Sequence, residues 1–264
     1  MTMKMQKLAQ SILKLADTAR RDLEVYTVRH KSLQVEVSDG EVETLREAQA
    51  TGVGVRVIDG GRLGLAFTTR LDEGSLRDTI RLATDNAQSA TPDEYNTLPS
   101  PKPVKDMDLL DPAMAQIPVD TKIQLARDVE KAARAYDPRV TKVRQAAYGD
   151  AVYEVGISNS RGLSVGYEGA YCSTSLLVVA EAEGQAEVGW SYDLSRSFDK
   201  LDPTKVGREA AAKAVEMLGA GTLTTCRVPI LLAPDVAADF LDVLGPANSR
   251  SGAKGKITFR WQAR

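Results

Sequence analysis

Apolar and polar residues alternate over several stretches of this chain, and tight-turn sequences separate these stretches. Leu33, Val35 and Val37 occupy every second position, the spacing that puts side chains on one face of a strand. Asp39-Gly40 follows, and this pair is typical of a two-residue hairpin because both turn residues need positive φ. Strands joined by such short turns are antiparallel, so the pattern excludes a βαβ series.

The first 90 residues predict a helix, an antiparallel meander and a second helix. Met5, Leu8 and Ile12 recur at helical spacing near the start of the chain. Ser75 is the candidate N-cap of a second helix that ends near Ala90, since serine is a favoured N-cap residue. Between the helices, strand-like stretches begin at Leu23 and at Leu33 and continue at 42–50, 52–58 and 63–69.

A proline-rich segment separates this half from a second half of the same order. Prolines exclude regular helix and central strand, so residues 91–118 are expected to be a linker. A helix capped by Asp120 then ends before Pro138, and another helix starts at Pro203. Between these helices lie five strand-like stretches, at 140–147, 151–158, 163–171, 174–183 and 187–194. Turns are predicted between them at Gly149-Asp150, 159–162, 171–173 and Gly184.

The end of the chain differs in composition. Residues 227–233 predict an apolar strand, and Pro234 starts a short helix. Residues 248–264 carry five basic residues and no acid. A solvated tail is therefore favoured over an edge strand in which Ile257 and Trp261 would share a face.

The predicted fold class is α+β. Two helix-plus-antiparallel-sheet domains, at 1–90 and 119–225, are joined by the linker 91–118. Residues 226–247 are expected to start a third, β-rich domain that is cut short, and 248–264 form the basic tail, of native or non-native origin. The length of 264 residues fits this division, because a domain usually holds roughly 100–200 residues.

The balance of charge excludes several classes of partner. The formal net charge is −2 and the pI is near 5.7, so no basic field is available to hold a nucleic-acid backbone or an anionic membrane. The first residues lack the unbroken apolar stretch of a signal peptide. No segment approaches the roughly 20 apolar residues of a membrane span. We expect a cytoplasmic protein that binds neither nucleic acid nor membrane.

Histidine and cysteine are scarce, which limits metal and nucleophile chemistry. The chain has one histidine, His30, and two cysteines, Cys172 and Cys226. A zinc site needs about three or four ligands, and Ser-His or Cys-His nucleophile systems need a histidine base. His30 is expected at a surface turn with Lys31. Both thiols are expected to be reduced and unreactive. No catalytic, cofactor-binding or metal residue is predicted.

Two further patterns have structural explanations. Segment 52–58 is similar to a glycine-rich dinucleotide loop, but its glycines lie inside a predicted strand, so phosphate binding is not expected. Glu181, Glu183 and Glu187 are spaced by even numbers, which would place them on one strand face. Such a row can bind a hard cation, but a solvated strand face is the favoured interpretation.

Three groups of segments are specific by their combination and order. They are Ser38-Asp39-Gly40 with 52–57 and 61–68, then 158–162 with 175–181 and Gly189, and last 207–211 with 226–232. Together, over nearly all of residues 1–247, they resemble the TldD/PmbA family of zinc metallopeptidases.

The resemblance implies a heterodimeric protease with a zinc-bearing TldD-type subunit and a PmbA-type subunit, also called TldE, of similar fold. In the TldD type, a helix after the third group carries His-Glu-x-x-x-His, whose histidines bind zinc. The corresponding stretch here, 233–241, has neither histidine. The chain therefore resembles the PmbA type, whose implied role is assembly and substrate enclosure, and zinc is expected only in the TldD-type partner.

The resemblance stops near Ala247, before the large C-terminal domain of the family, which indicates a truncated or frameshifted product. The leading hypothesis is a non-catalytic PmbA-like subunit, or its N-terminal part, that acts on peptides or unfolded segments with a TldD-type partner. Two alternatives stay open. One is a peptide-binding module that presents sheet edges, and the other is a non-functional fragment with an exposed interface.

Overall fold

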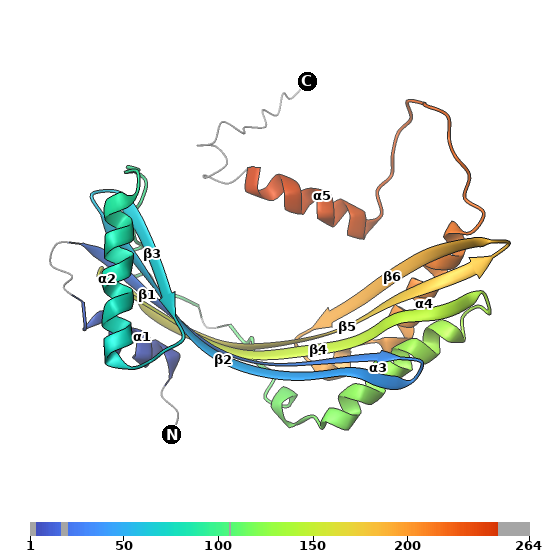
Figure 1. Ribbon diagram of the computed structural model, residues 1–264, viewed down its shortest axis with the longest axis horizontal. Helices are drawn as coiled ribbons and strands as arrows, with labels where there is room; N and C mark the ends of the chain where they lie inside the picture. The colour runs from blue at the N-terminus through green and yellow to red at the C-terminus, as the bar shows by residue number, and fades with distance from the viewer. Residues whose placement is uncertain (1–3, 17–20, 106, 248–264) are drawn as a thin grey trace. The chain divides into compact units, whose positions relative to one another are not determined.

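The computed structural model describes residues 4–16, 21–105 and 107–247. They fall into two compact units, one within 1–219 and one within 220–264 (Figure 1). The elements of the first unit are α1 (Met5–Leu13), β1 (Asp22–Ser38), β2 (Glu41–Asp59), β3 (Arg62–Thr68), α2 (Glu73–Ser89), η1 (Met114–Gln116), α3 (Val119–Arg134), β4 (Val140–Asn159), β5 (Ser164–Ala182), β6 (Gln185–Ser195), η2 (Phe198–Lys200) and α4 (Pro203–Met217), and the second unit contains α5 (Pro234–Ala247).

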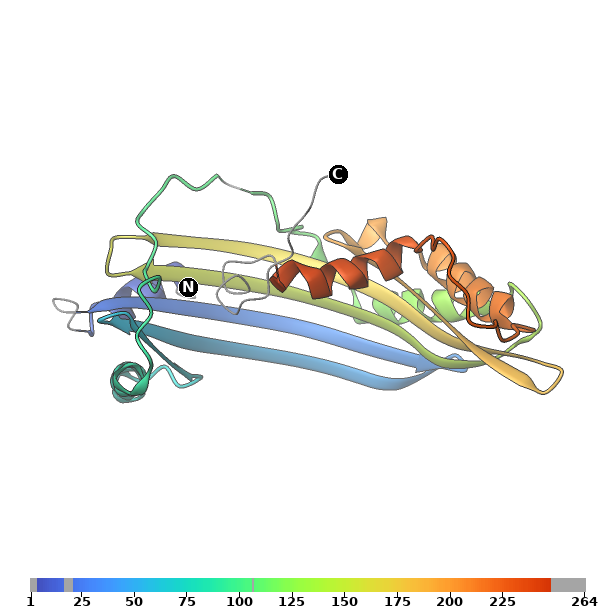
Figure 2. The ribbon, with the colours of Figure 1, turned by 90° about the horizontal axis from the view of Figure 1, so that it is seen from above.

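The strands of the first unit form one six-stranded sheet in the order β3-β2-β1-β4-β5-β6, and Figure 2 shows them side by side. The two predicted antiparallel meanders, and with them the α+β class, are confirmed. Their junction was not predicted. β1 pairs with β4 from Glu24↔Asn159 to Val37↔Ala146. The strands of both predicted domains therefore belong to a single sheet, and the predicted domain boundaries stay a prediction.

The strands are longer than predicted, and three predicted turns lie inside them. His30-Lys31 is in the middle of β1, Gly149-Asp150 is within β4, and 171–173 is within β5. The five stretches predicted for the second half are three strands. These predictions were wrong because neighbouring strands satisfy the backbone hydrogen bonds of these segments, and such pairing outweighs the local turn preference of glycine and aspartate.

The first hairpin has the predicted turn. Asp39 and Gly40 have φ values of 51° and 76°. Helix α3 holds this turn in place, because Gly40 N donates to Glu130 Oε2 at 3.0 Å and Arg127 Nε donates to Gly40 O at 2.8 Å. The turn thereby ties one end of β1 to α3.

Helices start near the predicted sites, but two predicted caps are wrong. Asp72 caps α2, because its Oδ1 accepts the N–H of Ser75 at 2.9 Å, so Ser75 lies in the first turn. Helix α3 follows Pro118 without a side-chain cap, and Asp120 lies in its first turn. An acidic side chain there still interacts favourably with the positive end of the helix dipole. Pro203 begins α4 as predicted.

Helices α1 to α4 cover the same face of the sheet. Odd-numbered residues of β1 point toward this face, since side chains alternate along a strand. Val25 is fully buried beneath the helices at one end, and Val35 is fully buried at the other. The opposite face of the sheet, which we call the open face, contains the even-numbered residues of β1.

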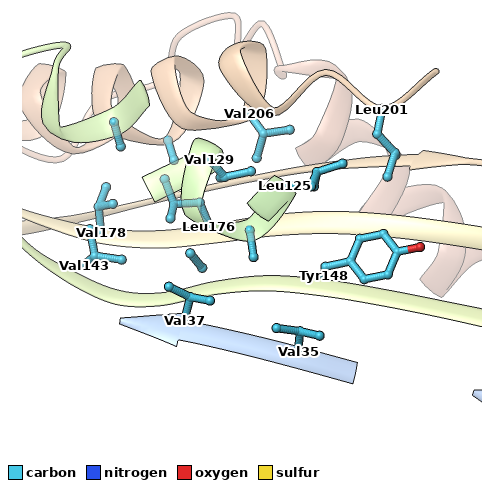
Figure 3. Close-up of a cluster of buried hydrophobic side chains, with 14 of the residues drawn as sticks. Val35, Val37, Leu125, Val129, Val143, Tyr148, Leu176, Val178, Leu201 and Val206 are labelled. Atoms are coloured by element: carbon cyan, nitrogen blue, oxygen red, sulfur yellow. The ribbon is translucent and has the colours of Figure 1, made fainter. Parts of the chain in front are cut away.

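Two hydrophobic cores result. The first core, at the α1 and α2 end, comprises Met5, Leu8, Ala9, Ile12, Leu23, Val25, Val53, Val55, Val57, Ala66, Leu76, Ala83 and Ala87. The second core, at the α3 and α4 end, includes Val35, Val37, Leu125, Val129, Val143, Tyr148, Leu176, Val178, Leu201 and Val206 (Figure 3).

Each core depends on a glycine at which a helix approaches a strand closely. A Cβ at Gly64 would lie 2.0 Å from Ala83 O in α2, and a Cβ at Gly189 would lie 2.0 Å from Ala210 O in α4. No side chain fits at either place. Glycine allows strand and helix backbones to approach closely.

The second unit has one described helix, α5, which begins at Pro234 as predicted and is longer than the short helix expected there. Residues 227–233 are irregular and exposed, so the strand predicted there is wrong. An isolated strand is not stable without a neighbour to satisfy its backbone, and the described part of this unit has none. The predicted basic tail, 248–264, lies outside the described residues.

Candidate functional site

A polar strip separates the two cores on the helix-covered face. Arg29 and Lys31 of β1 lie between the buried residues Val25 and Val35 and share their face. Here the sheet, η1 and the start of α3 enclose a cleft of about 430 Å³, which we call the central cleft. Its charged lining residues are Arg29, Lys31, Glu47, Lys122, Asp150, Glu154 and Glu168.

A buried ion pair lies where the central cleft meets the second core. Lys122 Nζ of α3 is 2.5 Å from Asp150 Oδ2 of β4, and the two side chains are only 9% and 8% exposed. Tyr148 OH donates to the same carboxylate oxygen at 2.9 Å. Such a desolvated pair is held in place only if further hydrogen bonds complete it, and Tyr148 supplies one.

Burial also suppresses the ionisation of two neutral groups beside this pair. Desolvation, followed by the negative charge of Asp150, raises the pKa of Tyr148 above its usual range. The same two causes raise the pKa of Cys172 to about 12. Cys172 is fully buried opposite Asp150 on the neighbouring strand. Its thiol therefore stays protonated at neutral pH, and the predicted lack of reactivity has a physical cause.

A second ion pair ties the central cleft to the first core. Arg29 Nη1 lies 3.0 Å from Glu154 Oε2, and Glu154 Oε1 accepts the N–H of Met5 at 2.8 Å. Glu154 therefore anchors the first turn of α1 to β4, at the helix end that favours a negative charge. The cleft and α1 share this carboxylate.

A third pair is more exposed. Lys31 Nζ lies 2.7 Å from Glu47 Oε1, and more than half of each side chain is exposed. The hydrogen bond from Lys31, and then its charge, lowers the pKa of Glu47. Exposed pairs of this kind add little to stability.

The central cleft is suited to holding a polar ligand. Its lining combines paired cations and carboxylates with the apolar side chains of Leu33, Met114 and Val152. Among these lining residues, none is a histidine or cysteine, so the described lining lacks the usual nucleophile–base pair of covalent catalysis. Paired charges beside apolar surface fit binding and positioning.

The structure places His30 on the open face, away from the central cleft. His30 lines a shallow hollow with Gln34, Gln145, Tyr171 and Ser173. The predicted surface turn is wrong, because His30 pairs with Ala50 and Tyr153 inside the sheet.

The predicted row of carboxylates does not form. Glu183 occupies the turn after β5 with a φ of 52°. Glu181 is paired with Ala186, and Glu187 is paired with Ala180, so Glu181 and Glu187 lie on opposite faces of the sheet. Glu181 also bonds Lys142 at 3.1 Å. The hairpin reverses the chain between these residues, which the even spacing does not reveal.

Two other predicted features keep their structural explanation. Segment 52–58 lies inside β2 and leads into a hairpin, not a helix, so it is not a dinucleotide loop. Cys226 is exposed in the second unit. No helix of the described residues is long and apolar enough to cross a membrane.

Helix α5 occupies the stretch where the TldD type is expected to bind zinc. Its ionisable residues are Asp235, Asp239 and Asp242, with no histidine or cysteine. Three carboxylates on one helix do not fit the nitrogen- and sulfur-rich donor set of zinc. In the described part of the chain, no group of three or more His, Cys, Asp or Glu side chains is placed to hold a metal ion.

The sequence did not predict the residues of the central cleft, although the position of Lys122 gave a signal that could have been used. Lys122 shares the helical stripe of Ala126, Val129 and Ala133, and a lysine within a buried stripe indicates a partner inside the fold. Asp150 was assigned to a turn, so its burial was not expected. Arg29 and Glu154 are distant in sequence, and only the β1–β4 pairing brings them together.

The fold defines an α+β protein whose helices cover one face of a long antiparallel sheet. Within this class, comparison with known families identifies one family. Residues 23–87 match the PmbA/TldA metallopeptidase domain 1, and residues 113–218 match the PmbA/TldA metallopeptidase central domain. The chain belongs to the PmbA/TldD family and is of the PmbA (TldE) type.

Individual relatives agree with this assignment. A metalloprotease PmbA homolog from Haemophilus influenzae is 28% identical over 261 residues, which cover 96% of this chain and 58% of the relative. Metalloprotease PmbA of Escherichia coli O157:H7 is 26% identical, covering 97% and 57%. The structure of TldE from Thermococcus kodakarensis shares the fold, with a TM-score of 0.67 at 23% identity over 80% of this chain and 47% of that one. The chain thus spans less than two thirds of the length of the curated relatives it matches.

Proposed function

We propose that this protein is a non-catalytic PmbA/TldE-like subunit of a heterodimeric zinc metalloprotease that degrades peptides or unfolded segments. Its partner would be a TldD-type subunit, which would supply the zinc ion. The proposed compartment is the cytoplasm. In this role the chain contributes to assembly and to enclosing the substrate.

The main support for this proposal is the set of possible metal-binding side chains in α5. The family resemblance places the zinc-binding histidines of the TldD type in this stretch, and this chain has Asp235 and Asp239 instead of any histidine. Zinc would activate water and polarise the scissile carbonyl in the partner. The central cleft supports a binding role, because its described lining lacks a nucleophile–base pair.

Co-purification with a TldD-type subunit tests the proposal. We expect a stable complex whose peptidase activity on an unfolded substrate such as casein exceeds that of the partner alone. The isolated chain should contain no stoichiometric zinc by elemental analysis. Zinc in the isolated chain, or failure to associate with the partner, would contradict the proposal.

Substitutions in α5 separate assembly from catalysis. Asp235→Asn and Asp239→Asn remove the two charges in the stretch where the TldD type is expected to bind zinc, while keeping side-chain size. Both variants are expected to leave the activity of the assembled complex unchanged. If activity is lost while the complex stays intact, α5 supplies a catalytic group and the non-catalytic role is wrong.

A further inference from the structure

At two edges of the sheet, backbone groups are already hydrogen-bonded to other parts of the first unit. At β3, Asn86 Nδ2 of α2 donates to Leu65 O at 2.8 Å, and the strand is only 7 residues long. The half of β5 that β6 does not pair lies beside the proline-rich linker, and Ala170 N donates to Leu109 O at 2.9 Å (Figure 2). Both devices occupy backbone groups that would otherwise accept a strand.

Among the described residues of the first unit, no helix side chain or linker segment forms such a hydrogen bond along the outer edge of β6. β6 is the last strand of the sheet and is 11 residues long. It pairs with β5 without a register shift and contains neither proline nor lysine. Proteins usually protect a long edge with bulges, prolines or lysines. The outer N–H and C=O groups of β6 are therefore arranged to pair with a further strand.

The two faces of β6 differ in chemistry. On the open face, Val188, Trp190, Tyr192 and Leu194 are between 46% and 60% exposed. The rings of Trp190 and Tyr192 are stacked with centroids 4.9 Å apart. The other face carries two acids, Glu187 and Asp193, beside the helix-packing residue Gly189.

Both charged residues of β6 itself, Glu187 and Asp193, are acidic. Between Arg161 and Arg196 the sequence contains no lysine or arginine. The acids in the same interval are Glu168, Glu181, Glu183, Glu187 and Asp193. An incoming strand with basic side chains is favoured at such an edge, because opposite charges on neighbouring strands attract.

We infer that the outer edge of β6 is a docking site for an extended segment of another polypeptide, which adds to the sheet as a seventh strand. Alternate apolar side chains of this segment contact Trp190 and its neighbours on the open face, and basic side chains face Glu187 and Asp193. This inference rests on the edge itself and does not depend on the proposed protease role.

The charges disfavour a second copy of the chain as the occupant. An antiparallel pairing of two β6 strands about Trp190 would place Glu187 of one copy opposite Asp193 of the other. Like charges directly opposite each other destabilise a strand pair. A partner of opposite charge avoids this repulsion.

The test uses the full chain and a fluorescein-labelled synthetic peptide of about nine residues, roughly the length of one strand, that alternates lysine with valine or phenylalanine. Fluorescence anisotropy should show saturable binding. Trp190→Thr, which keeps a strand-forming residue, should weaken binding by about tenfold or more. Phe67→Thr on the exposed open face of β3 is the matched control and should not change binding.

Three outcomes overturn the inference. One is a lack of saturable binding up to about 1 mM peptide, since affinity would then be negligible. Another is equal binding of a peptide with alternate N-methylated amides, because that peptide cannot pair as a strand. The third is a dimer of the chain, by sedimentation, that Trp190→Thr dissociates, because a second copy would then be the occupant. Circular dichroism of each variant confirms that the fold is retained.

Discussion

The first core and the second core lie on the same face of one sheet, and each is covered by two helices. Among the described residues, the ion pair in which both side chains are buried, Lys122–Asp150, belongs to the second core only. In the first core, the described buried polar side chains, such as Thr27 and Thr79, carry no charge. In the second, Lys122 and Asp150 are buried among apolar side chains together with Tyr148. Because the first core holds its helices without buried charge, the ion pair is not needed to attach helices to this sheet. Its position beside the central cleft suggests that it shapes the cleft.

The largest difference between the cores should appear when the ion pair is broken. Lys122→Met leaves Asp150 buried without its cation and should lower the free energy of unfolding by about 3–5 kcal/mol. Lys122→Met combined with Asp150→Leu should recover most of this loss, since a buried pair can often be replaced by apolar residues. Urea denaturation measures both. Lys131→Met, at an exposed site of the same helix, is the control and should change little.

The next test asks whether both cores depend equally on close backbone contact. Gly64→Ala in the first core and Gly189→Ala in the second each force a Cβ against a helix carbonyl. Each should lower the free energy of unfolding by about 3 kcal/mol, near the upper end for overpacking. Gly54→Ala on the open face, where the nearest atom is 4.0 Å away, is the matched control. Thermal unfolding of all three variants measures these changes. A smaller loss of stability for one of the two core variants would show that the helix at that site can move away from the strand.

A smaller effect is expected from the ion pairs of the central cleft. Arg29→Met removes a partly buried partner of Glu154 and should cost about 1–2 kcal/mol, more than a surface pair usually contributes. Lys31→Met removes a more exposed pair, and its cost should be below about 0.5 kcal/mol. Chemical denaturation distinguishes the two. Equal costs would mean that the burial of Glu154 contributes nothing.

The smallest effect at neutral pH concerns the thiols. With a pKa of about 12, only about one in ten thousand Cys172 side chains is ionised at pH 8. A disulfide exchange reagent at pH 8 should therefore modify Cys226 in the native chain and Cys172 only after unfolding. Rapid native modification of both thiols would show that the second core opens.

The same thiol predicts how stability changes in alkali. Because the folded pKa of Cys172 is raised above the value of 9.0 expected for a free thiol, the folded chain keeps a proton that the unfolded chain loses. Its contribution to stability is complete below pH 9 and is lost as the pH rises toward 12. The raised pKa of Tyr148 has the same sign. Cys172→Ala should reduce this alkaline loss.

Local patterns were enough to predict much of the fold. The helical spacing of Met5, Leu8 and Ile12, the Asp39-Gly40 turn and Pro203 each act within a few residues, and each is found where expected. Predictions failed where distant pairing outweighs local preference. Gly149-Asp150 favours a turn by itself, but β1 and β5 on either side hold it in a strand.

The candidate site was less predictable than the fold. Lys122 was detectable as a charge within an apolar stripe, but its partner Asp150 was not, because the two residues meet only after α3 packs on β4. Glu181 and Glu187 show the reverse case, since their even spacing predicted a shared face that the hairpin at Glu183 removes. Spacing is informative only within one continuous strand.

The sequence by itself determined the antiparallel meanders, the helices that flank them and the lack of histidine in α5, because each depends on residue type and short-range spacing. The tertiary structure alone decided that β1 and β4 join the two meanders into one sheet. It also decided that a charged cleft separates two cores and that β6 is the last strand of the sheet formed by the described residues. These features depend on contacts between residues more than a hundred positions apart, such as Arg29 and Glu154, and no local pattern encodes which distant strand will supply the neighbour.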